Sequence, residues 1–455
     1  MEGSSSVDTR IGERGAPRVS VGKAGVGREP RLPYRSILMA VDCSDHSNRG
    51  VSETLALAGL ADAGVTAIHV YAARMHDMRF RQMEGGLPER YRQQEALEQQ
   101  RDIHNELITR GLTLISESYL EAAARACREA SIPFTPCTAE GKNYRELARE
   151  TNSGRHDLLV IGAEGLGAGP GSGLGTVCER VMRRATIDTL VIKDPKRRLA
   201  EGPIVVAIDG SDHSFGGLTT ALVLAQSWGV PLQVVAAYDP HFHYVAFNRI
   251  SRVLSEEASR TFRFKEQERL HEEIIDAGLA KIYRAHLDIA RSIAAESGAT
   301  IETLLLDGKP HAAIEKHLRA VQPSLLVVGA LGIHADADLD IGGNAERLLR
   351  NVDCAVLLSR RSHRPRIDTV AAVTTIWTDE AERRMERVPE FARKMARMAI
   401  LQYAQERGHT MITENIVEEA TARLCPGHAP KATGAGNKAG DAGAGNEDPG
   451  ASDQR

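Results

Sequence analysis

Glycine recurs at every second or third position in one segment of this chain, between residues 162 and 176. The segment follows the apolar run LLVI, and Thr176 then begins a stretch with helical periodicity. Glycine lets backbone N–H groups approach an anion closely, and the start of a helix favours phosphate. A hydroxyl at position 176 could contact a phosphate oxygen or cap the helix. These residues indicate a phosphate cradle; the alternative is a flexible glycine-rich loop with a capping threonine.

A second polar segment, Asp42-Cys43-Ser44, follows the apolar run 36–41. Neither segment carries a common nucleotide signature. The glycine-rich loop contains no GxGxxG, and the chain contains no GxxxxGK[ST], which excludes a P-loop at the level of the motif. The sequence DCSDHS also differs from the SGGxDS of ATP pyrophosphatases.

An internal repeat organises the chain. The segment SILMAVDCSDHS returns as PIVVAIDGSDHS, and LLVIGAEG returns as LLVVGALG, both at an offset of 167 residues. Asp42 is thereby equivalent to Asp209. A constant offset between several segments indicates two copies of one domain. We name them copy one (34–195) and copy two (202–360).

Each copy alternates short apolar segments, typical of strands buried on both faces, with helical segments. This pattern predicts an α/β fold with a doubly wound, parallel, five-stranded sheet in each copy. With a strand order of 3-2-1-4-5, a ligand crevice opens between the first and fourth strands, beside Asp42 and the glycine-rich loop. Strands are expected near 36–42, 65–71, 134–138, 158–162 and 188–192, and near 204–209, 232–238, 301–306, 324–328 and 354–358.

Helices are expected at 47–63, 144–152 and 176–185 of copy one. A long polar insert, 72–133, adds helical periodicity at 89–110 and again at 117–130. The corresponding insert of copy two, 239–300, predicts a helical hairpin broken near Gly278.

Composition excludes several classes of protein. The 455 residues include 57 Lys and Arg and 61 Asp and Glu, which gives a net charge of −4. This charge gives no support for nucleic-acid binding. The mean hydropathy of −0.28 and the lack of a long apolar run predict no membrane span. Six scattered cysteines and no signal-like start predict a reduced, cytoplasmic protein. The ends, 1–33 and 426–455, are predicted to be disordered because they have too little apolar surface to bury.

The glycine spacing resembles that of the universal stress proteins. ATP-binding members of that family carry Gly-2x-Gly-9x-Gly-(Ser/Thr) after the fourth strand. Copy one matches the pattern in full, with Gly162, Gly165, Gly175 and Thr176. Copy two has the three glycines, but Gly343 replaces the hydroxyl residue. Two matches at one offset, each directly after an apolar strand, make the resemblance specific over about 320 residues.

The resemblance implies two tandem flavodoxin-like domains, with ATP, with or without Mg²⁺, in the crevice. It also implies that the copies pair with each other through their fifth strands; a homodimer stays open. Lys142 and Lys309 are expected to be solvated. The site residues implied are Val41, Asp42, Ser44, Val70, Gly162, Ala163, Gly165, Gly175, Thr176 and Val177 in copy one, and Asp209, Ala237, Gly329, Gly332, Gly342, Gly343 and Asn344 in copy two.

Copy two departs from copy one in charge. Its spacer, IHADADLDI, holds Asp336, Asp338 and Asp340, and three carboxylates beside a phosphate cradle should repel a polyanion. We therefore predict that copy one is the better nucleotide site. Calcium binding is an alternative, but the EF-hand positions for Gly and Glu are Ile341 and Arg347.

The insert of copy two contains His241 and His243, which could bind a metal ion or simply belong to an aromatic-rich packed loop. No carboxylate or cysteine partner lies nearby in the sequence, which favours packing.

A third, small helical domain is expected at 375–425. It reads as three short helices with an apolar face, and it resembles the C-terminal domain of the B subunit of light-independent protochlorophyllide reductase. The matching patterns are W-T-x-E-A, V-P-x-F-x-R and Y-A-x-x-x-G. The resemblance does not carry over the reductase activity. The face residues are Phe391, Met395, Met398, Ile400, Leu401 and Tyr403, and a docking surface or a solvated face could include Arg387, Arg393, Lys394 and Arg397.

Three functions are compatible with these residues. The first is a regulatory module in a stress response, in which ATP occupancy changes shape or partners. The second is a slow ATPase or autokinase that uses Thr176 or Ser44; the missing Walker lysine argues against efficient phosphoryl transfer. The third is an interaction scaffold that binds no nucleotide.

Overall fold

The computed structural model describes residues 31–169, 173–239, 276–336 and 340–424. The predictions for residues 1–30 and 426–455, for His241 and His243 and for Asp338 lie outside these residues. The predicted disorder is wrong for the last residues before copy one, because Leu32 is buried in the core. The chain divides into two compact units, one ending at Thr374 and the other beginning at Thr375.

A ten-stranded sheet runs through the first unit, in the order β3-β2-β1-β4-β5-β10-β9-β6-β7-β8. Each copy therefore has the predicted 3-2-1-4-5 order, which confirms the α/β fold class. The strands of copy one are β1 (Ser36–Ala40), β2 (Gly64–Tyr71), β3 (Phe134–Glu140), β4 (Leu158–Gly162) and β5 (Asp188–Ile192). The strands of copy two are β6 (Ile204–Ala207), β7 (Leu232–Tyr238), β8 (Glu302–Asp307), β9 (Leu325–Gly329) and β10 (Ala355–Ser359).

The two copies pair with each other through their fifth strands, as the resemblance implies. β5 and β10 are antiparallel, with Leu190 opposite Leu357, whereas all other neighbours in this sheet are parallel. At one end of the junction, the buried Asp188 carboxylate accepts the backbone N–H groups of Arg360 and Arg361 at 2.7 and 3.1 Å. Its other oxygen accepts the Tyr34 hydroxyl at 2.8 Å. The two copies thus share one continuous sheet.

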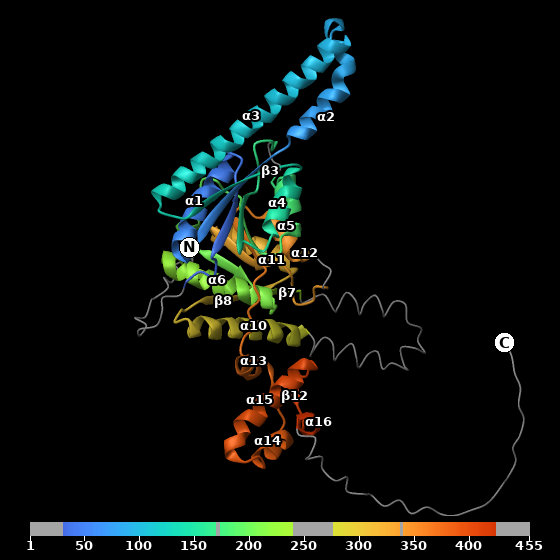
Figure 1. The fold of residues 1–455 in the computed structure, drawn as a ribbon. Coiled ribbons are helices and arrows are strands. Elements are labelled where there is room, and N and C mark those ends of the chain that lie inside the picture. Colours follow the sequence, from blue (N-terminus) through green and yellow to red (C-terminus); the bar gives the residue numbers. More distant parts are fainter. Residues whose placement is uncertain (1–30, 170–172, 240–275, 337–339, 425–455) are drawn as a thin grey trace, which may run out of the picture. The chain divides into compact units, whose positions relative to one another are not determined.

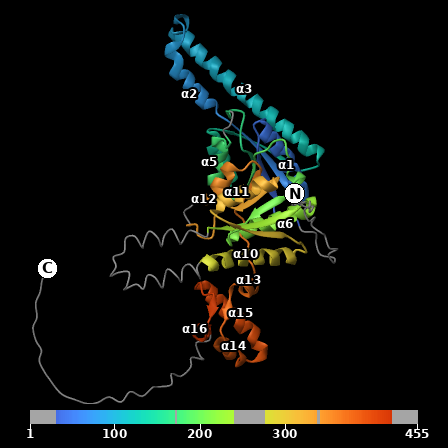
Figure 2. The ribbon, with the colours of Figure 1, turned by 180° about the vertical axis from the view of Figure 1, so that it is seen from behind.

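Helices cover both faces of the sheet (Figures 1 and 2). One apolar core lies under α1, α3, α6 and α10, and the other under α4, α5, α11 and α12. Both cores continue from one copy into the other. In copy one the helices are α1 (Asp45–Ala61), α2 (Ala73–Met83), α3 (Gln94–Glu129), α4 (Asn143–Thr151) and α5 (Thr176–Arg184). In copy two and after it they are α6 (Asp212–Trp228), α10 (Asp276–Glu296), α11 (Pro310–Val321), α12 (Gly343–Asn351) and α13 (Ile367–Thr374).

The inserts differ from the prediction. α3 is one continuous helix, so the expected interruption between residues 110 and 117 is wrong, and α3 forms a projecting hairpin with α2 (Figure 1). α10 is described only from Asp276 onward, so the break expected near Gly278 stays a prediction. A glycine inside a helix costs only about 1 kcal/mol. Packing of α3 against β2 outweighs this cost.

The second unit contains α14 (Asp379–Glu386), α15 (Glu390–Glu406) and α16 (Glu414–Leu424). The three predicted helices are present, and Thr378 caps α14 as its pattern suggests. The unit is not wholly helical, because β11 (Ile376–Trp377) and β12 (Met411–Ile412) form a short parallel pair.

The predicted apolar face of α15 is divided. Its C-terminal part, including Leu401 and Tyr403, is buried, whereas Phe391 is 90% exposed. Of the basic residues, Arg397 pairs with Glu382 at 2.6 Å and lies over the Trp377 ring, and Arg393 donates to backbone carbonyls. Arg393 and Arg397 therefore make their contacts within the unit.

Candidate functional site

The loop after β1 is organised around Asp42. Its Oδ1 accepts the backbone N–H of Ser44 at 3.0 Å and the Ser44 hydroxyl at 2.6 Å. The Ser44 hydroxyl oxygen in turn accepts the N–H of Ser47 and caps α1. The carboxylate is therefore fixed at the carboxyl edge of the sheet, beside β4.

The loop after β4 closes against the same carboxylate. Asp42 Oδ2 accepts the backbone N–H of Leu166 at 3.3 Å. A Cβ placed on Gly165 would lie 2.5 Å from this oxygen, and one on Gly162 would lie 2.9 Å from the His46 Cβ. Only glycine allows these approaches, because real Cβ atoms do not come so close. The sequence pattern thus reflects direct contact between the two loops.

The glycine-rich loop ends at the start of α5. The N–H of Gly175 donates to the Ala163 carbonyl at 2.7 Å, which returns the loop to β4. Gly175 is the N-cap residue and Thr176 is the first helical residue, so the alternative of a capping threonine is wrong. Thr176 is exposed and Val177 is half-buried. The first N–H groups of a helix have no partner within it, so this end can receive an anion.

Copy two repeats this backbone geometry closely. Asp209 accepts the N–H and hydroxyl of Ser211 at 3.0 and 2.6 Å, and the N–H of Ile333 at 3.0 Å. A Cβ on Gly332 would lie 2.7 Å from Asp209 Oδ2, and Gly342 N–H donates to the Ala330 carbonyl at 2.7 Å. In the described parts of the two loops the backbone contacts are alike, so the differences found there lie in side chains.

Those side chains differ at the end of the loop. The first residues of α12 are Gly343 and Asn344, where copy one has Thr176 and Val177. The carboxylate of Asp340 lies 3.4 Å from Arg183 of copy one, and its carbonyl accepts the Arg360 guanidinium. Part of the negative charge expected to repel a polyanion is therefore neutralised.

The other residues predicted for the site lie near the same edge of the sheet. Val41 is buried, and its N–H donates to the Ile68 carbonyl, which extends the pairing of β1 with β2. Val70 packs on the second core, and Ala237 is buried at the equivalent place. Gly329 closely approaches α6, as Gly162 approaches α1. Lys142 and Lys309 are exposed beyond β3 and β8, outside the crevice.

A histidine beneath each aspartate was not predicted. His69 of β2 lies 2.8 Å from the Ser116 hydroxyl and edge-on to Tyr119. Burial lowers the pKa of His69, and the charge of Asp42 opposes this shift. Copy two also has an imidazole here, but it comes from another position of the repeat: His286 is the counterpart of Tyr119. The His286 ring lies directly over Gly210. Burial lowers the pKa of His286 too, against the charge of Asp209.

The loop after the first strand needs a left-handed residue in both copies. Cys43 has φ of 64° and its counterpart Gly210 has φ of 88°. A residue other than glycine costs about 1–2 kcal/mol in this conformation. Because Cys43 and Gly210 both adopt the left-handed conformation, the fold of the loop requires it whichever residue stands there.

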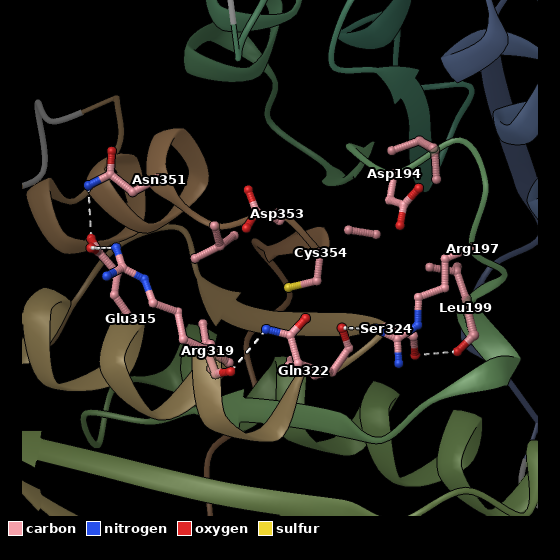
Figure 3. A pocket seen from close by; sticks show the side chains of 15 residues that line it. Asp194, Arg197, Leu199, Glu315, Arg319, Gln322, Ser324, Asn351, Asp353 and Cys354 are labelled. Atoms are coloured by element: carbon pink, nitrogen blue, oxygen red, sulfur yellow. Dashed lines mark hydrogen bonds and ion pairs between the residues drawn. The ribbon is translucent and has the colours of Figure 1, made fainter. Parts of the chain in front are cut away.

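A small cavity of about 80 Å³ lies where the two copies meet, and none of the predicted site residues lines it (Figure 3). Asp194, Arg197, Asp353 and Cys354 line it, so its charges are mixed. Burial raises the pKa of the Cys354 thiol to about 11, which keeps the thiol protonated near neutral pH. We assign no chemistry to this cavity.

Two searches bear on other ligands. Within the described part of the chain, no three His, Cys, Asp or Glu side chains gather in a way that could hold a metal ion. In the same residues, every helix is too short or too polar to cross a membrane.

Comparisons with known proteins identify the domains. The model of the universal stress protein family matches residues 33–193 and 202–360. A model described as proto-chlorophyllide reductase 57 kD subunit matches residues 377–420.

Some relatives match one copy of this chain, and others match both copies. Universal stress proteins of Thermus aquaticus and Bacillus subtilis are each 28% identical to this chain, covering 34% of it and 97% of their own length. A universal stress protein structure from Archaeoglobus fulgidus is 15% identical and covers 72% of this chain and 98% of its own, with a TM-score of 0.46. Because the two family matches together span most of its length, this chain belongs to the universal stress protein family.

Proposed function

We propose that the chain is a regulatory nucleotide-binding module of a stress response, which binds ATP, with or without Mg²⁺, in the crevice between β1 and β4 of copy one. The observation that carries this proposal is the closure of two loops around one carboxylate. Asp42 holds the loops together, and Gly165 permits their contact. This arrangement leaves the start of α5 available at the end of a glycine-rich loop.

Copy one is the better site in this proposal. Its α5 begins with a threonine, whose hydroxyl can donate to a phosphate oxygen, whereas α12 begins with Gly343. Its loop has Gly173 at the position that Asp340 occupies in copy two. A triphosphate therefore meets fewer like charges in copy one.

The test compares two glycines of one loop in the full chain. Gly165→Ala forces the Asp42 carboxylate to move, whereas a Cβ on Gly167 meets nothing within 4 Å. We expect Gly165→Ala to weaken ATP binding at least about tenfold in a calorimetric titration, the equivalent of about 1.4 kcal/mol. Gly167→Ala should bind ATP as the unaltered chain does. Equal affinities in all three proteins would refute the assigned site.

The other two functions give different results. A scaffold would carry no nucleotide, so mass spectrometry of the freshly purified, denatured protein should detect none. A slow ATPase or autokinase would release phosphate or label itself well above background in the presence of Mg²⁺. The proposed module should bind ATP without appreciable turnover.

A further inference from the structure

Four charged side chains, which we call the interface cluster, join the two copies beside the cradles. They are Glu179 and Arg183 of α5 and Glu346 and Arg350 of α12. Arg350 Nη2 donates to Glu179 Oε1 at 2.6 Å, and Arg183 donates to Glu346 across the junction. The repeat offset relates Glu179 to Glu346 and Arg183 to Arg350, so the cluster is reciprocal.

The cluster reaches the first turn of α5. Glu179 lies three residues beyond Thr176, which is about 5 Å along the helix axis. A carboxylate there interacts well with the helix dipole, but it repels an anion bound at the same helix end. An unscreened Glu179 would therefore oppose the binding of a triphosphate.

Arg350 supplies the screening charge from copy two. Hydrogen bonds to Glu179 and Glu346 raise the pKa of Arg350, so its guanidinium stays charged. Its backbone is held against copy one, because Lys193 Nζ donates to the carbonyls of Leu349 at 2.8 Å and of Arg350 at 3.2 Å. Backbone contacts with Lys193 thus hold Arg350 beside the cradle of copy one, independently of the hydrogen bonds of its guanidinium.

We propose that Arg350 is a positioning residue that completes the cradle of copy one from copy two: it neutralises Glu179 and adds positive potential beside the phosphates. The inference rests on the proposed nucleotide binding. It makes the affinity of copy one depend on the pairing of β5 with β10, because Arg350 comes from copy two, whereas Arg183 of copy one lies 3.9 Å from Glu179.

The reciprocal contact in copy two is less favourable. Arg183 is shared between Glu346 and Asp340, and the position equivalent to Asp340 in copy one is Gly173. Arg350 is shared as well, between Glu179 and Glu346. Arg183 contacts these two carboxylates and Asp340, so the positive charge offered to the second cradle is shared with one more carboxylate. This is a second reason for copy one to be the better site.

The experiment isolates copy one in the full chain. Gly332→Ala places a Cβ 2.7 Å from Asp209 Oδ2, so we expect it to weaken binding by copy two as Gly165→Ala weakens binding by copy one. In that background, Mg-ATP is titrated calorimetrically into Arg350→Ala, Arg350→Lys and Arg319→Ala proteins. Arg319 is 75% exposed and pairs weakly with Glu315 at 3.9 Å, so its variant controls for the loss of one positive charge.

Arg350→Ala should weaken Mg-ATP binding about three- to tenfold at low salt, and the difference should shrink as salt rises. Arg350→Lys should restore most of the affinity, because it keeps the charge. Arg319→Ala should have little effect. Thermal unfolding of each protein without nucleotide reports whether the fold is kept.

Each result has a distinct meaning. Unchanged affinity in a folded Arg350→Ala protein overturns the inference and leaves the proposed function standing. An equal loss in the Arg319→Ala protein, or no recovery with lysine, also overturns it, since only general charge or packing would then matter. If the unaltered chain binds no ATP, the proposed function fails and this inference fails with it.

Discussion

Replacement of Asp42 by asparagine tests the link between the two loops. In the unaltered chain the N–H of Leu166 donates to Asp42 Oδ2. Asparagine can still accept the Ser44 hydrogen bonds with its carbonyl oxygen, but its NH₂ group then faces the N–H of Leu166 and cannot accept from it. Losing a hydrogen bond to a charged group costs about 1.5–3 kcal/mol. If ATP binding requires the contact between the two loops, this cost in free energy corresponds to a roughly 10- to 100-fold higher Kd for ATP.

The repeat supplies a matched control. Asp209→Asn removes the same contact, from the N–H of Ile333, in copy two. We expect both variants to lose a similar free energy of unfolding in chemical denaturation. Only Asp42→Asn should lose most of its ATP affinity in a calorimetric titration, because copy one is the better site.

Two outcomes would refute this reasoning. An equal loss of affinity in both variants would show that the copies bind alike. A loss of stability without any loss of affinity in Asp42→Asn would show that the junction of the loops is purely structural.

Thr176, the loop of copy two and His69 offer further tests. Thr176→Ala should weaken ATP binding with little change in thermal stability, because Gly175 remains the cap; unchanged affinity would remove the hydroxyl from the site. Gly343→Ser with Asp338→Asn should strengthen nucleotide binding by copy two when copy one is disabled, since a Cβ on Gly343 meets nothing within 4 Å; no gain would refute the charge argument. Burial lowers the pKa of His69 below its ordinary value of 6.5, so the unfolded chain binds more protons in acid. Stability should therefore fall as pH drops below about 6.5, and His69→Asn should reduce that slope in denaturation curves; an unchanged slope would show that His69 does not titrate.

The fold was largely predictable because the repeat and the strand pattern are local signals. Strands buried on both faces must be short and apolar, and the LLVIG and LLVVG segments are placed as β4 and β9. Alternation with helices then leaves few topologies. The positions of Gly162, Gly165 and Asp42 at one crevice follow from that topology.

Other features depend on contacts that no local pattern encodes. The continuity of α3 through its glycine follows from packing against β2. The short pair of β11 and β12 joins residues more than thirty positions apart. His69 and His286 come from different positions of the repeat, so comparison of the copies conceals their shared place beneath the aspartates.

The sequence by itself determined the two copies, the order of their strands and the places of the glycines after the fourth strand, because these are local patterns. The steric need for glycine at 162 and 165 comes from contacts with His46 and Asp42 in the folded chain. Only the tertiary structure decided that Arg350 lies beside Glu179 and that Asp340 is held by Arg183. These pairs join residues more than 150 positions apart, and their electrostatic effect depends on distance through space. The charge that each cradle presents to a nucleotide is therefore a property of the paired copies.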